Sequence, residues 1–232
     1  RVDYTNSTAA VTVTLGGWSD GTALDGLGGT DTLRGIEAVR GSIYSDHLYA
    51  SARNTWVGDG YFESFEGLEG NDTIDGSAGG PTRVDYSASP GGVTVDLGQG
   101  QAQDGFAGVD TLIGIDWVRG SDFADHLTGS DGKNLFEGRA GDDSIDGGLG
   151  EDTVKFAGVR SDYTVSYDPT NQTLTVADKV SGRDGSDAIK NVERLAFSDG
   201  NFLVGTDGAL APEGGRITVN PAGSYLASSS DT

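Results

Sequence analysis

The residues best placed to do chemistry are the acids and glycines of one continuous stretch, Gly120–Lys155, where a nine-residue pattern occurs four times without a gap. Each copy opens on glycine, carries Asp or Asn at its sixth place and has an apolar residue at its eighth. A glycine-rich turn can point successive backbone carbonyls inward, because glycine tolerates backbone angles that are closed to other residues. Carbonyl and carboxylate oxygens are the ligands that calcium prefers, about six to eight per ion. The pattern therefore predicts several calcium sites, with sixth-place ligands Asp125, Asn134, Asp143 and Asp152.

Other residues of these turns would complete the ligand shells. Acids at matching places elsewhere in the chain are the next candidates. Within the stretch, the further metal candidates are Gly120, Asp122, Gly138, Ala140, Gly141, Gly147, Leu149 and Gly150. Outside it they are Asp31, Asp46, Asp72 and Asp110.

The last three residues of each copy form a minimal strand whose central apolar residue faces a core. One nonapeptide is then half a turn of a parallel solenoid, so that copies two apart stack on each other. Asp125 and Asp143 would share one ion, and Asn134 and Asp152 would share an ion on the opposite edge. We expect the metal to carry much of the folding energy.

Composition supports a fold that depends on cations. Lys and Arg total 15 against 36 Asp and Glu, giving a net charge of −21, and 39 residues are glycine. Such a chain struggles to fold alone, because glycine loses the most entropy on ordering and like charges repel. An acidic, disordered or highly soluble surface is the alternative interpretation, but the regular placement of the acids favours bound divalent ions. The acidic balance argues against nucleic-acid binding, which needs a basic surface.

The sequence also excludes other ways of holding the chain together. It has no cysteine, so it has neither disulfides nor a cysteine-based zinc site. No run approaches the roughly twenty apolar residues of a membrane span. The chain begins without a signal peptide or Met, and we interpret it as a fragment or processed piece of a protein.

A longer repeat lies over the nonapeptides. Arg1–Thr5 recurs as Arg83–Ser87, and Asp25–Ser42 aligns with Asp104–Ser121. We therefore expect two tandem β-roll copies, residues 1–82 and 83–155. Matches are poorer in the first copy, which predicts fewer or weaker ions there.

Residues 156–203 have fewer glycines and more apolar side chains, and are expected to form a β-rich cap on the open end of the solenoid. Tyr163–Tyr167 and Thr173–Val176 flank a Pro- and Asn-containing turn, the pattern of a hairpin. Residues 204–232 are rich in Gly, Ala, Ser and Pro and are interpreted as a linker or tail.

These nonapeptides, together with the VDYS…VTVDL opening and the DYTVSY…DAIKNVERLAFSDG closing segment, resemble the RTX (haemolysin-type calcium-binding) family of bacteria. The resemblance implies an all-β fold, a parallel β-roll with a C-terminal β capping segment. It also implies export by a type I secretion apparatus, an extracellular or cell-surface location, and folding on reaching external calcium. RTX modules serve toxins, proteases, lipases, epimerases, adhesins and surface layers, so the family leaves function open.

Three functions remain open at this stage. The leading hypothesis is a non-enzymatic calcium-dependent module for export, folding and structural extension or adhesion. The second is the C-terminal part of a secreted hydrolase or epimerase whose catalytic domain precedes Arg1. The third is a calcium-dependent module that binds a glycan or surface receptor through an aromatic cluster, although core packing is the favoured interpretation of these aromatics. That cluster comprises Tyr44, Trp56, Tyr61, Phe62 and Phe65.

No catalytic constellation stands out. His47 and His126, the two histidines, occupy equivalent repeat positions and have no evident partner ligands, so they are interpreted as repeat filler. The segment Gly17–Gly21 matches G-x-S-x-G, but it lacks the strand–turn–helix setting of a nucleophile elbow. We therefore expect no enzyme activity from these residues.

Overall fold

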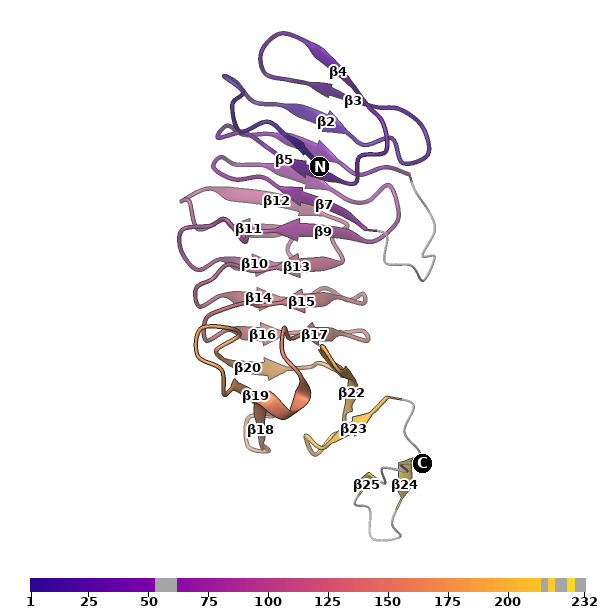
Figure 1. Cartoon of the computed structure of the whole chain (residues 1–232), viewed down its shortest axis with the longest axis vertical. Coiled ribbons are helices and arrows are strands. Elements are labelled where there is room, and N and C mark those ends of the chain that lie inside the picture. The colour runs from indigo at the N-terminus through magenta and orange to yellow at the C-terminus, as the bar shows by residue number, and fades with distance from the viewer. Residues whose placement is uncertain (53–61, 214–216, 220–224, 228–232) are drawn as a thin grey trace.

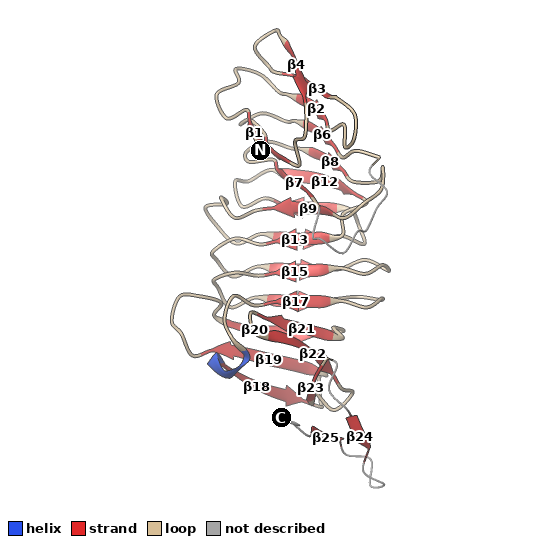
Figure 2. Ribbon diagram, turned by 45° about the vertical axis from the view of Figure 1, so that its right-hand side comes forward, coloured by secondary structure: helices blue, strands red, loops and turns tan. Residues whose placement is uncertain are grey.

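The chain forms an elongated stack of short strands, seen from two directions in Figures 1 and 2. This computed structural model describes residues 1–52, 62–213, 217–219 and 225–227, with side chains up to residue 213. Two sheets run along the length of the stack, and turns at its two edges carry the chain from one sheet to the other. The expected all-β, parallel β-roll fold is confirmed.

The first sheet, sheet A, has ten strands, and its first eight pair in parallel. In spatial order they are β1 (Val2–Asp3), β5 (Ala38–Arg40), β7 (Glu63–Glu66), β9 (Thr82–Asp85), β13 (Trp117–Arg119), β15 (Leu135–Glu137), β17 (Thr153–Lys155), β21 (Arg194–Phe197), β22 (Gly200–Val204) and β23 (Leu210–Pro212).

The second sheet, sheet B, has thirteen strands and mixes parallel and antiparallel pairs. In spatial order they are β4 (Thr30–Leu33), β3 (Gly21–Leu24), β2 (Thr12–Thr14), β6 (His47–Tyr49), β8 (Thr73–Asp75), β12 (Val109–Ile113), β11 (Gln101–Gln103), β10 (Thr94–Asp96), β14 (His126–Thr128), β16 (Ser144–Asp146), β20 (Ser186–Lys190), β19 (Thr173–Asp178) and β18 (Tyr163–Asp168).

The core is a column of apolar side chains between the sheets. Because side chains alternate across a strand, a three-residue strand points only its central residue inward. Full burial of such a side chain contributes roughly 1.5–3 kcal/mol. In sheet A the fully buried central residues include Phe65, Val84, Val118, Phe136 and Val154. In sheet B they include Leu48, Ile74, Leu127 and Ile145.

Register confirms that one nonapeptide is half a turn. Leu127 pairs with Ile145 in sheet B, 18 residues on, and Phe136 pairs with Val154 in sheet A. Copies two apart therefore stack, as the repeat predicts.

Each tandem copy also contains an antiparallel meander that was not predicted. β2, β3 and β4 form the first, and β10, β11 and β12 form the second. The added strands β3 and β11 each bury only one alanine, Ala23 or Ala102. Their hydrophobic signal is therefore too weak to identify from the sequence.

The end of the stack that follows β17 is closed by longer strands, as expected of a cap. β18 and β19 form the predicted hairpin and continue sheet B through β20. β22 and β23 continue sheet A past residue 203, where a tail was expected to begin. The remaining elements are a 3-10 turn, η1 (Arg160–Asp162), and a separate hairpin of β24 (Ile217–Val219) and β25 (Tyr225–Ala227).

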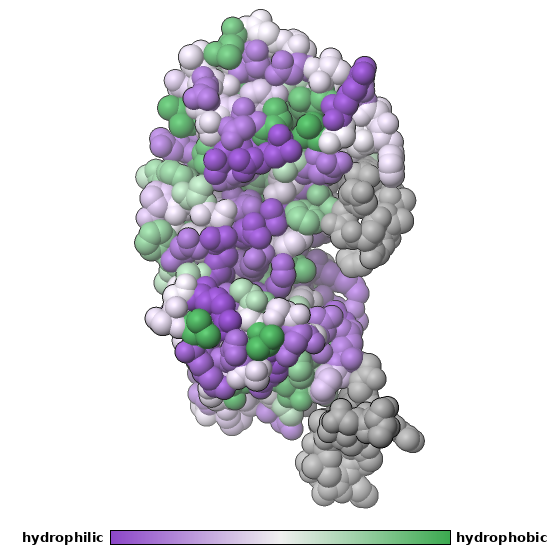
Figure 3. All heavy atoms as spheres, viewed as in Figure 1, coloured by the Kyte–Doolittle hydropathy of each residue, from purple (hydrophilic) through white to green (hydrophobic). Residues whose placement is uncertain are grey.

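The outer surface is mostly polar. On the face seen in Figure 3, hydrophobic residues occur as small, separate groups among hydrophilic ones. Among the described residues, no helix has the length and apolar character needed to cross a membrane.

Candidate metal centre

The candidate ligands lie in two columns of stacked turns, one along each edge of the roll. The first turn column contains turns 41–46, 67–72, 120–125 and 138–143, which lead from sheet A into sheet B, and turns 104–110 and 184–187, which join strands of sheet B. The second turn column, on the opposite edge, includes turns 76–81, 114–116, 129–134, 147–152 and 191–193.

Backbone amides and carboxylates join the acids of the first turn column into ladders. The N–H of Asp125 donates to Oδ1 of Asp143 at 2.9 Å, and the N–H of Asp143 donates to Oδ1 of Asp187 at 3.0 Å. A second ladder has the same geometry, at 2.8 and 3.0 Å, and joins Asp46, Asp72 and Asp110. All six side chains are buried.

The second turn column repeats the arrangement. The N–H of Asn134 donates to Oδ1 of Asp152 at 2.7 Å, and that of Asp152 donates to Oε2 of Glu193 at 2.8 Å. The structure therefore stacks Asn134 on Asp152 at one edge and Asp125 on Asp143 at the other, as the half-turn repeat predicts.

Three turns satisfy their sixth-place side chain internally, through a serine at the second place. In these serine turns (41–46, 120–125 and 129–134), the serine N–H and hydroxyl both donate to the sixth-place side chain. For Ser121 the bonds to Asp125 measure 2.8 Å from the amide and 2.7 Å from the hydroxyl. The amide reaches Oδ2 of Asp125 and the hydroxyl reaches Oδ1, so both oxygens have donors within the protein. The N–H of Val93 also donates to Oδ1, at 2.8 Å.

Three other turns leave one carboxylate oxygen without any donor. In these open turns (67–72, 138–143 and 147–152), Oδ2 of Asp72, Asp143 and Asp152 is buried and has no hydrogen-bond partner. The second place has a left-handed backbone, as in Arg139 at φ 78°, and the fourth place is a glycine near φ 125°. No serine hydroxyl is present in these turns, because the second place is Leu68, Arg139 or Gly148.

The open oxygens face the glycine at the start of the turn. A Cβ added at Gly138 would overlap Oδ2 of Asp143, so the first-place glycine is required by space. At Gly147, a Cβ would meet both Oδ2 of Asp152 and the carbonyl oxygen of Asn191 in the adjoining turn. Oxygens from neighbouring turns therefore converge, which is the donor set that a hard cation requires.

Side chains alone do not complete a shell. Within the described part of the chain, no point is surrounded by three or more acidic or histidine side chains suited to a metal ion. Backbone carbonyls must therefore supply most of the remaining ligands, as the glycine-rich turns allow.

Without a bound cation, burial disfavours the ionised form of the open carboxylates. Burial, followed by neighbouring carboxylates, raises the pKa of Asp143 to about 8, and burial raises that of Asp72 to about 8. Burial also raises the pKa of Asp152 to about 6. A bound cation reverses this effect, because it favours the ionised carboxylate. The residues present therefore fit a calcium ion.

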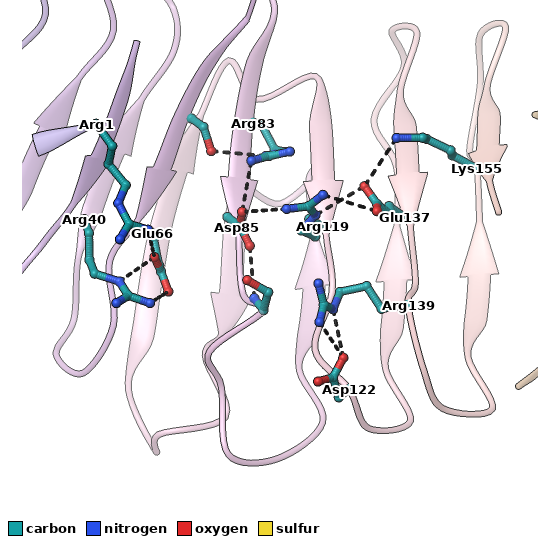
Figure 4. A network of polar contacts seen from close by, with 12 residues as sticks. Arg1, Arg40, Glu66, Arg83, Asp85, Arg119, Asp122, Glu137, Arg139 and Lys155 are labelled. Atoms are coloured by element: carbon teal, nitrogen blue, oxygen red, sulfur yellow. Dashed lines mark hydrogen bonds and ion pairs between the residues drawn. The ribbon is translucent and has the colours of Figure 1, made fainter. Parts of the chain in front are cut away.

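The protein's own cations are largely used elsewhere. On the outer face of sheet A, basic and acidic side chains alternate across adjacent strands (Figure 4). Arg40 forms two 2.7 Å bonds to Glu66, and Arg119 lies 3.4 Å from Asp85 and 3.2 Å from Glu137. Among the described residues, the carboxylates of Asp72, Asp143 and Asp152 form no ion pair, although the exposed Glu151 of one open turn pairs with Lys133.

Some predicted ligands lie outside the ladders. Asp31 is exposed on the outermost strand β4, where its carboxylate accepts a 3.2 Å bond from Tyr4. Asp122 is exposed and forms an ion pair with Arg139 at 2.7 Å. The remaining predicted positions belong to the turns themselves, and they are Gly120 in a serine turn and Gly138, Ala140, Gly141, Gly147, Leu149 and Gly150 in open turns.

Further acidic residues, which the nonapeptide pattern did not identify as ligands, also lie in or beside the two turn columns. Each fits the same short signal, an acid two places before a buried apolar residue, except Asp104, which precedes a turn. Asp187, for example, precedes Ile189, and Glu193 precedes Leu195. The added residues are Glu63, Asp104, Asp116, Asp187 and Glu193.

The proposed aromatic cluster is only partly visible. Phe65 is core, and Phe62 packs on Trp117 with ring centroids 4.4 Å apart, while Tyr44 is exposed. Trp56 and Tyr61 lie outside the described residues. His47 and His126 are exposed on sheet B.

Comparison with family models finds one match. Residues 57–80 and 119–154 match the RTX calcium-binding nonapeptide repeat, in four copies. These residues include all three open turns. A comparison with curated proteins finds no match.

Proposed function

We propose that this chain, which matches the repeat of the RTX calcium-binding nonapeptide family over residues 57–80 and 119–154, is a calcium-triggered folding module of a secreted or cell-surface bacterial protein. The repeats of that family bind calcium, so the chain is a calcium-binding β-roll. The proposal adds the location, the role in export and extension, and the residues that hold the ions.

The observation that carries the proposal is the set of buried, unpartnered oxygens in the open turns. Leaving a buried charged group unpaired costs several kcal/mol, and no described basic side chain pairs with the carboxylates of Asp72, Asp143 or Asp152. Calcium would join Asp72, Asp143 and Asp152 to carbonyl oxygens of the adjacent turns. The ion would neutralise the carboxylates, and the turns would hold the ligand oxygens in place around it.

Affinity and compartment would together make a switch. Extracellular calcium modules typically have Kd values of about 10⁻⁴–10⁻³ M, far above cytosolic calcium. Each site that binds only the folded state adds about 2.7 kcal/mol at a hundredfold excess over Kd. A few sites would therefore decide whether the chain is folded, and a type I apparatus would receive it unfolded.

Circular dichroism tests the proposal directly. Calcium added to chelator-treated protein should produce a cooperative gain of strand signal, whereas magnesium should not, because magnesium demands octahedral geometry and dehydrates reluctantly. Equal strand signal with and without chelator would contradict calcium-triggered folding. An export assay in a type I secretion host, with the three open-turn aspartates changed to alanine, tests the location.

A further inference from the structure

The two tandem copies meet at a junction in the first turn column. β8 of the first copy pairs in parallel with β12 of the second, aligning Ile74 with Leu112. The N–H of Val109 donates to Oδ1 of Asn71 at 2.8 Å, which places turn 104–110 directly against open turn 67–72.

Three carboxylates are buried at this junction. Asp72, Asp104 and Asp110 are exposed to 1%, 0% and 1%. Asp104 orders its own turn, since its Oδ1 accepts the N–H groups of Phe106 and Gly108, both at 2.8 Å. Its Oδ2, like that of Asp72, is buried without a hydrogen-bond partner.

The charges of the three groups act on one another, and none is paired with a cation in the described residues. Burying unpaired carboxylates together is strongly unfavourable unless a cation neutralises them. Asp110 is otherwise satisfied, because it accepts bonds from the N–H of Asp72 at 3.0 Å and the hydroxyl of Tyr86 at 3.0 Å.

A carbonyl oxygen from the first copy points to the same place. A Cβ added at Gly108 would overlap both the carbonyl oxygen of Gly70 and Oδ2 of Asp104. The two oxygens therefore approach one point from opposite sides of the junction, and glycine keeps the space between them open.

We propose that Asp104 is a calcium ligand and that, with Asp72 and the carbonyl of Gly70, it holds an ion that joins the two copies. The inference rests on the proposed calcium-binding function and adds a ligand, Asp104, that lies outside the nonapeptide pattern. It makes the junction between the copies a calcium-dependent contact.

The first copy contains a matched control. Asp25 forms the same turn, accepting the N–H groups of Leu27 and Gly29 at 2.8 Å each. Strand β4, which follows that turn, is the outermost strand of sheet B, and no described strand pairs with its outer edge. Asp25 is also more exposed than Asp104.

The test compares Asp104→Asn with Asp25→Asn. Asparagine keeps the oxygen that orders each turn and removes only the charge. In equilibrium dialysis with calcium, Asp104→Asn should bind one ion fewer or bind it about tenfold more weakly, since charge count sets affinity. Asp25→Asn should match the wild type, and equal ion counts and midpoints for all three proteins would overturn the proposal.

A second measurement avoids dependence on the folding of Asp104→Asn. Tyr86 donates to Asp110 beside the proposed ion, and Tyr4 donates to the exposed Asp31. With terbium in place of calcium, Tyr86→Phe should lose more tyrosine-sensitised emission than Tyr4→Phe. Equal losses would overturn the junction site, while calcium-induced strand formation would still support the proposed function. Absence of any calcium response in the wild type would instead overturn the proposed function.

Discussion

At the scale of single residues, the residue at the second place of a turn decides whether the buried aspartate at the sixth place has donors for both of its carboxylate oxygens. Asp125 and Asp143 occupy successive steps of one ladder and are exposed to 1% and 2%. Asp125 has a serine hydroxyl as donor, whereas Oδ2 of Asp143 has none. The second residue of the turn therefore separates a carboxylate whose two oxygens both have donors from one that keeps an unpartnered oxygen.

Removing an open carboxylate should weaken the calcium response. Asp143→Ala should raise the calcium midpoint of folding well above that of wild type, because a charged ligand is lost. Asp3→Ala is the control, since Asp3 is exposed and pairs with Arg1 and Arg40 on the surface. Calcium titration followed by circular dichroism measures both midpoints, and equal shifts would contradict the assignment of Asp143.

Removing the serine hydroxyl of a serine turn should lower the stability of the protein without abolishing calcium binding. Ser121→Ala deletes the buried hydroxyl that donates to Asp125, and should lower the free energy of unfolding by about 1–3 kcal/mol. Ser144→Ala, on the exposed face of β16, should change it by less than about 0.5 kcal/mol. Urea unfolding at saturating calcium provides the comparison, and a lost ion in Ser121→Ala would argue that this turn also binds metal.

At the scale of elements, each three-residue strand contributes a single core side chain, so each such side chain matters greatly. Phe136 is fully buried between Val118 and Val154 in sheet A. Strands this short have little other means of holding their register, and the stack depends on contact with the rung on either side.

Truncating the core side chain of one strand should therefore lower the free energy of unfolding substantially. Phe136→Ala should reduce the free energy of unfolding by about 3–5 kcal/mol, from lost burial and the cavity left behind. Phe123→Ala should have little effect, because Phe123 is 47% exposed in a turn. Thermal unfolding in calcium measures both variants, and similar losses would contradict the assigned core.

At the scale of the whole molecule, charge opposes compaction until cations bind. The chain carries a net charge of −21, and Arg40, Arg83 and Arg119 pair with acids on sheet A, not with the open carboxylates. Calcium-free protein should therefore be expanded, with a radius of gyration on the order of 50 Å for an unfolded chain of this length.

Small-angle X-ray scattering should record a marked decrease in that radius on adding calcium. Magnesium at matched ionic strength should cause only the modest contraction expected from charge screening. A full contraction with magnesium would indicate general neutralisation of the chain in place of specific calcium sites.

The sequence alone determined the fold class, the half-turn repeat and most of the acids that stack. These features depend on a local nine-residue period, in which Asp143 and Ile145 specify a turn and a core position within three residues. Tertiary structure decided that Asp104 is buried at the junction between the copies, where its turn lies against open turn 67–72. That outcome depends on residues far apart in the chain, such as Asn71 and Val109 at a sequence separation of 38, and no local pattern encodes it.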